Sequence, residues 1–251
     1  MIATPVLTDS QIAAFARDGY VVVPGAFGAA DAATIERWAR EVEALPEKPG
    51  RHWVFHEKSR IDGRDLINRI EYIAPFHDGF AALTRVLAAP AAQLFGEEVR
   101  LFKEKINFKM PGGGGFEPHQ DSQAGWDAYA SNFINAMVCI DEATIENGCI
   151  ELAPGQNRRG LLRGMEPLTA EDTAGMGFVA YPMKPGDMAL FDAYVPHRSE
   201  PNPTGTARRM YFATYNRASE GDHLVRYYAD KRKNYPPDIE REAGREYVYR
   251  V

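Results

Sequence analysis

The stretch VRLFKEKINFKM, residues 99–110, marks the change in sequence pattern that decides the fold. From this point the chain consists of short β-rich runs separated by Gly, Pro and Asn turn signals. The later runs are FINAMVCIDEA, GCIELAP, GFVAYPM, DMALFDA and RRMYFATYNRA. Short strands at this spacing favour a sandwich or barrel over βαβ units. We therefore predict a mainly β fold, a double-sheet jelly roll with flanking N-terminal helices.

The residues before this stretch are predicted to be largely helical. In LTDSQIAAFARDGY, Thr8 is placed as an N-cap with Gln11 three residues later, which is a capping-box pattern, and Gly19 is placed to end the helix. YVVVPG then has the pattern of a buried strand ended by a turn. A second helix is expected over residues 31–45.

A third helix is expected in DGFAALTRVLAAPAAQLFG, with Pro90 interrupting it. The charged segment before it reads as strands and loops, and whether residues 51–65 close over a site stays open. No linker divides the chain. We expect a single domain over residues 1–251, with helical decoration to about residue 98, a jelly-roll core over about 99–217 and a tail over about 218–251.

Composition restricts the possible partners. The net charge is −6 and the pI is about 5.6, which argues against nucleic-acid binding, because that affinity depends largely on Lys and Arg at phosphates. No apolar run is long enough to span a bilayer, and no secretory signal is evident. Cys139 and Cys149 lie in apolar runs, where a free cysteine behaves as a small hydrophobe; a disulfide between them stays open, but the pattern fits a reducing compartment. We expect a cytoplasmic protein with a small-molecule substrate, no nucleic acid and no membrane partner; the oligomeric state is not predicted.

The stretch FEPHQDSQAGW, residues 116–126, contains the first candidate site. In a strand, residues i and i+2 point to the same side, so His119 and Asp121 can present an imidazole and a carboxylate to one metal ion. His197 follows the predicted strand in DMALFDA and can face the mouth of a barrel. Two histidines and one carboxylate fill one face of an octahedron and leave three positions open, as in non-heme Fe(II) oxygenases.

An arginine follows these residues in the sequence and is a candidate for binding an anion. Arg208 follows His197 by eleven residues and shares a strand face with Met210, Phe212 and Thr214. A guanidinium that points into a barrel needs a carboxylate partner. Read without the upstream residues, Arg208 or Arg209 is more simply interpreted as an exposed charge at a strand start.

Taken together, these motifs resemble the phytanoyl-CoA dioxygenase family. The resemblance rests on HQD, ENGCIELAPG, KPGDMALFDAYVPH and the arginine after His197, with LTDSQIAAFARDGYVVVPG similar to the family's N-terminal helix and strand, so that it covers about residues 7–216. It implies a cupin-like double-stranded β-helix. It also implies an Fe(II)- and 2-oxoglutarate-dependent dioxygenase, with O2 as the second co-substrate.

The resemblance assigns roles residue by residue. His119, Asp121 and His197 would be the iron ligands and catalytic residues. Arg208 would bind the far carboxylate of 2-oxoglutarate, with Ser199 as a hydroxyl helper. Halogenating relatives lack the carboxylate ligand, so Asp121 argues for hydroxylation. Where the family commonly has Pro-Gly-Ser-His, this chain has PGQN at residues 154–157, a departure that does not affect an iron ligand.

Substrate contacts are predicted from residues near the ligand pair. In residues 101–110, Lys103, Lys105, Asn107 and Lys109 share one strand face. These lysines could face solvent, since Lys is rarely buried without a partner. Alternatively, Lys105 occupies a position that lines the pocket in relatives, and with Asn107 it would favour an anionic substrate. Further candidate substrate contacts are Gln123, Tyr129, Asn132 and Tyr194.

The substrate class is therefore expected to be a small anionic or zwitterionic metabolite. Family members with small polar substrates hydroxylate aminoalkylphosphonates or compatible solutes, and the chain has no evident feature for binding CoA. A phosphonate is the favoured hypothesis. The competing hypothesis from another class is a cupin-like zinc metalloprotein, either a hydrolase or a binding module, which would not need Arg208.

Overall fold

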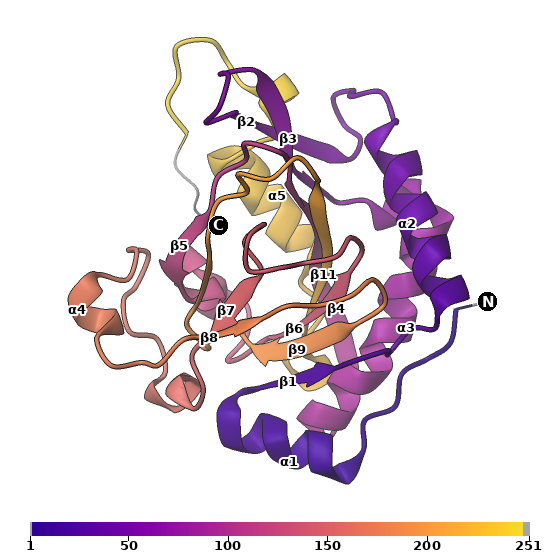
Figure 1. Cartoon of the computed structure of the whole chain (residues 1–251), viewed down its shortest axis with the longest axis vertical. Coiled ribbons are helices and arrows are strands. Elements are labelled where there is room, and N and C mark those ends of the chain that lie inside the picture. Colours follow the sequence, from indigo (N-terminus) through magenta and orange to yellow (C-terminus); the bar gives the residue numbers. More distant parts are fainter. Residues whose placement is uncertain (1, 248–251) are drawn as a thin grey trace.

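Two antiparallel sheets form the framework of the protein, whose computed structural model describes residues 2–247 (Figure 1). The larger sheet has the order β1 (Tyr20–Val23), β9 (Met188–Asp192), β6 (Ile134–Cys139), β11 (Arg208–Arg217), β4 (Val99–Lys109), β3 (Asp65–Glu71) and β2 (Trp53–Lys58). The smaller sheet has the order β5 (Phe116–His119), β10 (His197–Ser199), β7 (Ile150–Leu152) and β8 (Val179–Tyr181). The strands therefore form the predicted double-sheet architecture.

The first helix is capped as the sequence predicts. Helix α1 (Asp9–Asp18) begins after Thr8, whose side chain accepts from the backbone N–H of Gln11, and the reciprocal bond of the capping box is also present. It ends at Gly19, which has a φ of 82° that residues with a side chain rarely adopt. Strand β1 follows at once and pairs with β9.

The prediction that Pro90 interrupts the third helix is wrong. Helix α3 (Asp78–Phe95) continues through Pro90, which is buried. A proline inside a helix removes one backbone hydrogen bond. Here the apolar face of α3 packs on the large sheet with α2 (Ala29–Glu43), and this burial outweighs the loss. Within residues 2–247, neither these helices nor α4 (Ala170–Thr173) and α5 (Leu224–Asn234) combine the length and apolarity that crossing a membrane requires.

Strand β4 separates two different environments. Its residues Ile106 and Phe108 are buried among the residues of α2 and α3. The alternate residues Lys105 and Asn107 line a cavity between the two sheets, and Lys103 and Lys109 on the same face are 2% and 1% exposed. The prediction that these lysines face solvent is therefore wrong. The apolar face of β4 packs against α2 and α3, and because alternate residues of a strand point to opposite sides, the lysine face points toward the interior between the sheets.

Candidate metal centre and cavity

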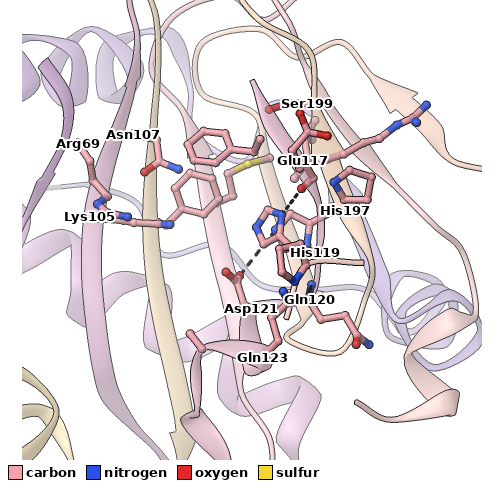
Figure 2. Close-up of a pocket in the computed structure, with 18 of the residues that line it drawn as sticks. Arg69, Lys105, Asn107, Glu117, His119, Gln120, Asp121, Gln123, His197 and Ser199 are labelled. Atoms are coloured by element: carbon pink, nitrogen blue, oxygen red, sulfur yellow. Dashed lines mark hydrogen bonds and ion pairs between the residues drawn. The ribbon is translucent and has the colours of Figure 1, made fainter. Parts of the chain in front are cut away.

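The three predicted metal ligands come together between strands of the small sheet. His119 ends β5, His197 begins β10, and the two are direct partners in the antiparallel register, with ring centroids 4.1 Å apart. Gln120 keeps an extended backbone, so Asp121 points to the same side as His119 although it begins a 3₁₀ turn. Ligand atoms of the three residues lie within 4.8 Å of one another, and Figure 2 shows them facing one point.

Backbone carbonyls fix the orientation of both imidazoles. Nδ1 of His119 lies 2.7 Å from the carbonyl oxygen of Glu117, and Nδ1 of His197 lies 3.0 Å from that of Val195. A carbonyl only accepts, so each Nδ1 carries the proton and donates it. In the neutral form of each ring, Nε2 is then the nitrogen with the lone pair, which is the tautomer that a metal requires.

The carboxylate of Asp121 is held by a side chain of the large sheet. Nδ2 of Asn135 donates to Oδ2 of Asp121 at 2.9 Å, and Oδ1 of Asn135 accepts from the Thr214 hydroxyl at 2.6 Å. Both Asn135 and Thr214 are 1% exposed. Asn135 thus acts as an outer support for a metal ligand, of the kind that tunes metal affinity.

The protonation states suit metal binding. Burial, together with the neighbouring His197, lowers the pKa of His119 to about 3, so the imidazole is neutral near pH 7. Burial alone would raise the pKa of Asp121, but interactions with His197 and Lys105 lower it to about 2. The site therefore offers a neutral imidazole at His119 and a carboxylate anion at Asp121, and with the imidazole of His197 these residues are the donor types of a 2-His-1-carboxylate iron site.

A cavity of about 380 Å³ opens at these residues. Arg208 and Ser199 line it and are 4% and 8% exposed. Nε of Arg208 has no hydrogen-bond partner, and among the ion pairs of residues 2–247 it is the neighbouring Arg209 that pairs with Asp141. Burial lowers the pKa of Arg208 to about 10, so it still carries its charge at neutral pH. A buried, charged arginine that lines a cavity indicates an anionic ligand.

The wall opposite the metal ligands is cationic. Figure 2 shows Arg69, Lys105 and Asn107 on one side of the cavity and the His–Asp–His group on the other. Arg69 comes from β3 and pairs in register with Asn107 on β4. Its guanidinium lies 4.5 Å from the ring centroid of Phe55 and 2.8 Å from the carboxylate of Glu71, which fixes its position. Glu71 in turn forms a buried ion pair with Lys231 of α5.

The remaining predicted substrate residues differ in where they lie. Gln123 lines the cavity, but its amide already bonds the backbone of Gln120 and Glu166. Tyr129, Asn132 and Tyr194 are not among the lining residues. Their side chains form hydrogen bonds with groups outside the cavity.

The hydroxyl of Tyr129 donates to Asp230 of α5 at 3.0 Å, and its ring packs in an aromatic cluster with Phe102 and Tyr227. The amide of Asn132 donates to Asp192, and the hydroxyl of Tyr194 donates to the carbonyl of Ser131. Closeness in sequence to the metal ligands is therefore not closeness to the cavity, and the substrate site proposed below does not include these three residues.

Two residues of this site were not predicted from the sequence: Arg69, which lines the cavity, and Asn135, which bonds Asp121. Arg69 lies in a charged segment in which apolar and polar residues alternate only weakly, so the sequence did not indicate which side chains face inward. Asn135 had a usable signal: in FINAMVC it alternates with Met137 and Cys139 on one face of a strand, and an amide on an otherwise apolar inward face needs a partner.

Comparison with known proteins agrees with this geometry. Residues 15–210 match the family model described as Phytanoyl-CoA dioxygenase (PhyH). The chain is 36% identical to a 2-aminoethylphosphonate dioxygenase of uncultured bacterium HF130_AEPn_1, covering 96% of this chain and 93% of that protein. It is 38% identical to a methylphosphonate hydroxylase of Gimesia maris, covering 91% and 88%. The crystal structure of EctD from S. alaskensis with 2-oxoglutarate and 5-hydroxyectoine superimposes with a TM-score of 0.74 at 29% identity, covering 85% of this chain and 77% of that one.

Fold and site together define a non-heme iron, 2-oxoglutarate-dependent dioxygenase on a double-stranded β-helix. The chain belongs to the phytanoyl-CoA dioxygenase family. Its cofactor is Fe(II) with 2-oxoglutarate, and the His–Asp–His triad that suits this metal is present. The alternative of a zinc-holding hydrolase or binding module is thereby rejected, and the substrate is a small molecule.

Proposed function

We propose that this enzyme hydroxylates a C–H bond of a small anionic or zwitterionic metabolite, and that the substrate is an alkylphosphonate or aminoalkylphosphonate. The observation that carries the proposal is the cationic wall of Arg69 and Lys105 facing the metal ligands. A phosphonate presents up to two negative charges and three oxygen acceptors, which such a wall matches. The two phosphonate-oxidising relatives, similar over nearly the whole chain, support the same substrate class.

The protein's own contribution to the reaction is ligation and positioning. His119, Asp121 and His197 would hold the metal on one face and leave the other positions accessible from the cavity. Fe(II) with 2-oxoglutarate and O2 supplies the oxidising power for C–H hydroxylation, with succinate and CO2 as co-products. Arg208 would bind the far carboxylate of 2-oxoglutarate, with the Ser199 hydroxyl as a second donor.

The substrate anion would bind at the opposite wall. Arg69 offers a guanidinium that can bind two oxygens at once, Lys105 a compact ammonium and Asn107 an amide donor. Held there, the anionic group directs the rest of a short substrate toward the metal ligands. Orienting a substrate in this way is a large part of an enzyme's rate advantage.

A carboxylate in the cavity offers a means of selecting an amino group. Among the described lining residues, Glu117 is the one carboxylate besides Asp121. It would attract the ammonium of 2-aminoethylphosphonate and contribute nothing to methylphosphonate. Glu117→Gln should therefore raise KM for the amino compound by several-fold and leave KM for methylphosphonate unchanged; equal changes for both would exclude this role.

A substrate screen tests the proposal. Fe(II)-loaded protein is incubated with 2-oxoglutarate, O2 and single compounds: methylphosphonate, 2-aminoethylphosphonate, ectoine and a fatty acyl-CoA. We expect succinate formation to be stimulated by a phosphonate, and Lys105→Met and Arg69→Met to raise KM for it at least about tenfold, since each removes a charged hydrogen-bond partner. Stimulation only by neutral or lipid-like compounds would contradict the proposal.

We also propose that the enzyme acts in the cytoplasm. Cys139 and Cys149 are both free and buried, which is consistent with a reducing compartment. Fractionation of the source cells, with recovery in an oxidising compartment as the contrary result, tests this placement.

A further inference from the structure

Lys109 is a buried lysine that the site described above does not use. It ends β4, is 1% exposed, and pairs in register with Arg208 on β11. It is not among the residues that line the cavity. A lysine is almost never fully buried without partners, so its role has to be sought in the groups that its ammonium contacts.

The ammonium of Lys109 joins two separate parts of the chain. Nζ donates to the hydroxyl oxygen of Ser199 at 2.8 Å, to the carbonyl of Gly148 at 3.2 Å and to the carbonyl of Glu200. An ammonium has three protons, so these three acceptors use all of them. Lys109 therefore ties the segment before β7 to the end of β10, next to the cavity.

The backbone around Lys109 is built for this close approach. Gly148 has a φ of +76°, and a Cβ added there would lie 2.0 Å from the carbonyl oxygen of Glu200 and 2.8 Å from Nζ of Lys109. Only glycine avoids both contacts. The amide of Asn202 also donates to the backbone carbonyl of Lys109 at 2.8 Å, which fixes the strand end.

The contact with Ser199 determines what its hydroxyl can do in the cavity. A serine hydroxyl has one proton to donate and two lone pairs that accept. Lys109 carries no lone pair when charged, so it occupies an acceptor position of Oγ and leaves the proton of Ser199 available to another group. Ser199 and Arg208 both line the cavity, which makes an anion beside Arg208 the natural acceptor.

The charge of Lys109 also favours an anion at this place in the cavity. Burial, and after it the neighbouring Arg208, lowers the pKa of Lys109 to about 7. An anion bound beside both residues would offset their mutual repulsion and favour the charged ammonium.

We infer that Lys109 is a positioning residue for the 2-oxoglutarate carboxylate: it orients the Ser199 hydroxyl as a donor and adds a second positive charge behind Arg208. The inference rests on the proposed carboxylate site formed by Arg208 and Ser199. It goes beyond that site because it assigns a function to a residue that does not line the cavity.

The test is a binding measurement that needs no primary substrate. The affinity of Fe(II)-loaded protein for 2-oxoglutarate is measured anaerobically by calorimetry, for wild type, Lys109→Met, Ser199→Ala and the double variant. Binding of 2-oxobutyrate, which has the same keto acid end but no far carboxylate, is measured in parallel. Thermal melting and metal content confirm that each variant is folded and loaded.

We expect Lys109→Met to weaken 2-oxoglutarate binding at least about tenfold, the loss typical of a hydrogen bond involving a charged group. Binding of 2-oxobutyrate should change less than about twofold. The double variant should lose less than the product of the two single losses, because both substitutions remove the same oriented hydroxyl. A purely structural role would weaken both keto acids alike.

Three results would overturn the inference: unchanged 2-oxoglutarate affinity in Lys109→Met, equal losses for both keto acids, or fully additive losses in the double variant. If Lys109→Met does not fold, Lys109→Gln keeps donors for the carbonyls without the charge, and the same selective loss is required of it. Arg208→Gln separates the two proposals. If Arg208→Gln keeps wild-type affinity for 2-oxoglutarate, the proposed carboxylate site itself is wrong. If Arg208→Gln loses affinity for 2-oxoglutarate and Lys109→Met does not, only the role of Lys109 is rejected.

Discussion

Replacing Asn135 by alanine should weaken metal binding without touching a metal ligand. The amide of Asn135 is the side-chain donor to Asp121, at 2.9 Å, and it accepts in turn from the Thr214 hydroxyl at 2.6 Å. Asn135→Ala removes both bonds. Asp121 would keep its charge but lose the group that fixes the direction of its carboxylate.

The size of the effect follows from the two bonds. A hydrogen bond to a charged group contributes about 1.5–3 kcal/mol, and about 1.4 kcal/mol corresponds to a tenfold change in affinity. Loss of such an outer support typically lowers metal affinity about 10- to 100-fold, in agreement with that energy. The Thr214 hydroxyl, 1% exposed, would also lose its acceptor, which should destabilise the fold by about 1–3 kcal/mol.

The assay is anaerobic competition for Fe(II) between the protein and a chromophoric chelator, combined with urea unfolding. Thr214→Val is the matched control, since it removes the second bond and keeps the first. We expect near wild-type Fe(II) affinity for Thr214→Val, and a loss of about 10- to 100-fold for Asn135→Ala. Equal Fe(II) affinities in Asn135→Ala and wild type, or an equal loss in both variants, would show that the bond from Asn135 to Asp121 does not support metal binding.

Three further outcomes are expected from single substitutions. Burial raises the pKa of Glu104 to about 8, above its ordinary value of 4.5. Between these two pH values the folded state keeps a proton that the unfolded state has released. The free energy of unfolding should therefore fall as pH rises from about 4.5 to about 8. Urea unfolding at about pH 5 and about pH 9 should show that Glu104→Gln shrinks this difference, by on the order of a few kcal/mol; an undiminished difference would show that another group is responsible. Gly148→Ala should lower Tm by several degrees and weaken 2-oxoglutarate binding, because its Cβ would meet the Glu200 carbonyl; wild-type values for both would contradict the close packing of these two segments. Arg69→Lys should raise KM for a phosphonate by several-fold while leaving 2-oxoglutarate affinity unchanged, since an ammonium cannot reproduce a two-point contact; steady-state kinetics decides, and a change in 2-oxoglutarate affinity alone would place Arg69 at the co-substrate.

Much of the metal centre could be predicted because it depends on local geometry. An extended backbone through Gln120 places His119 and Asp121 on one side, and this is a property of strands in general. The pairing of His119 with His197 depends on which strands become neighbours. The sequence order does not determine that neighbourhood, and only the similarity to a known family supplied it in advance.

The substrate wall was harder to predict because it depends on which face of a strand turns inward. The alternation in β4 was plain, but both faces had a plausible reason to be buried. The structure decides it through the helices: α3 needs Ile106 and Phe108 beneath it, so the lysine face turns toward the cavity. Tyr129 shows the converse case, since a short turn after Asp121 carries it toward α5 rather than toward the cavity.

A crystal structure of the enzyme prepared anaerobically with Fe(II) and 2-oxoglutarate would test the metal site and the carboxylate site together. It should contain one iron bound by Nε2 of His119, Nε2 of His197 and the carboxylate of Asp121, with the far carboxylate of 2-oxoglutarate on Arg208 and the Ser199 hydroxyl. An iron bound elsewhere, or a far carboxylate held by Lys105 and Arg69 on the opposite wall, would contradict the assignment of these two sites.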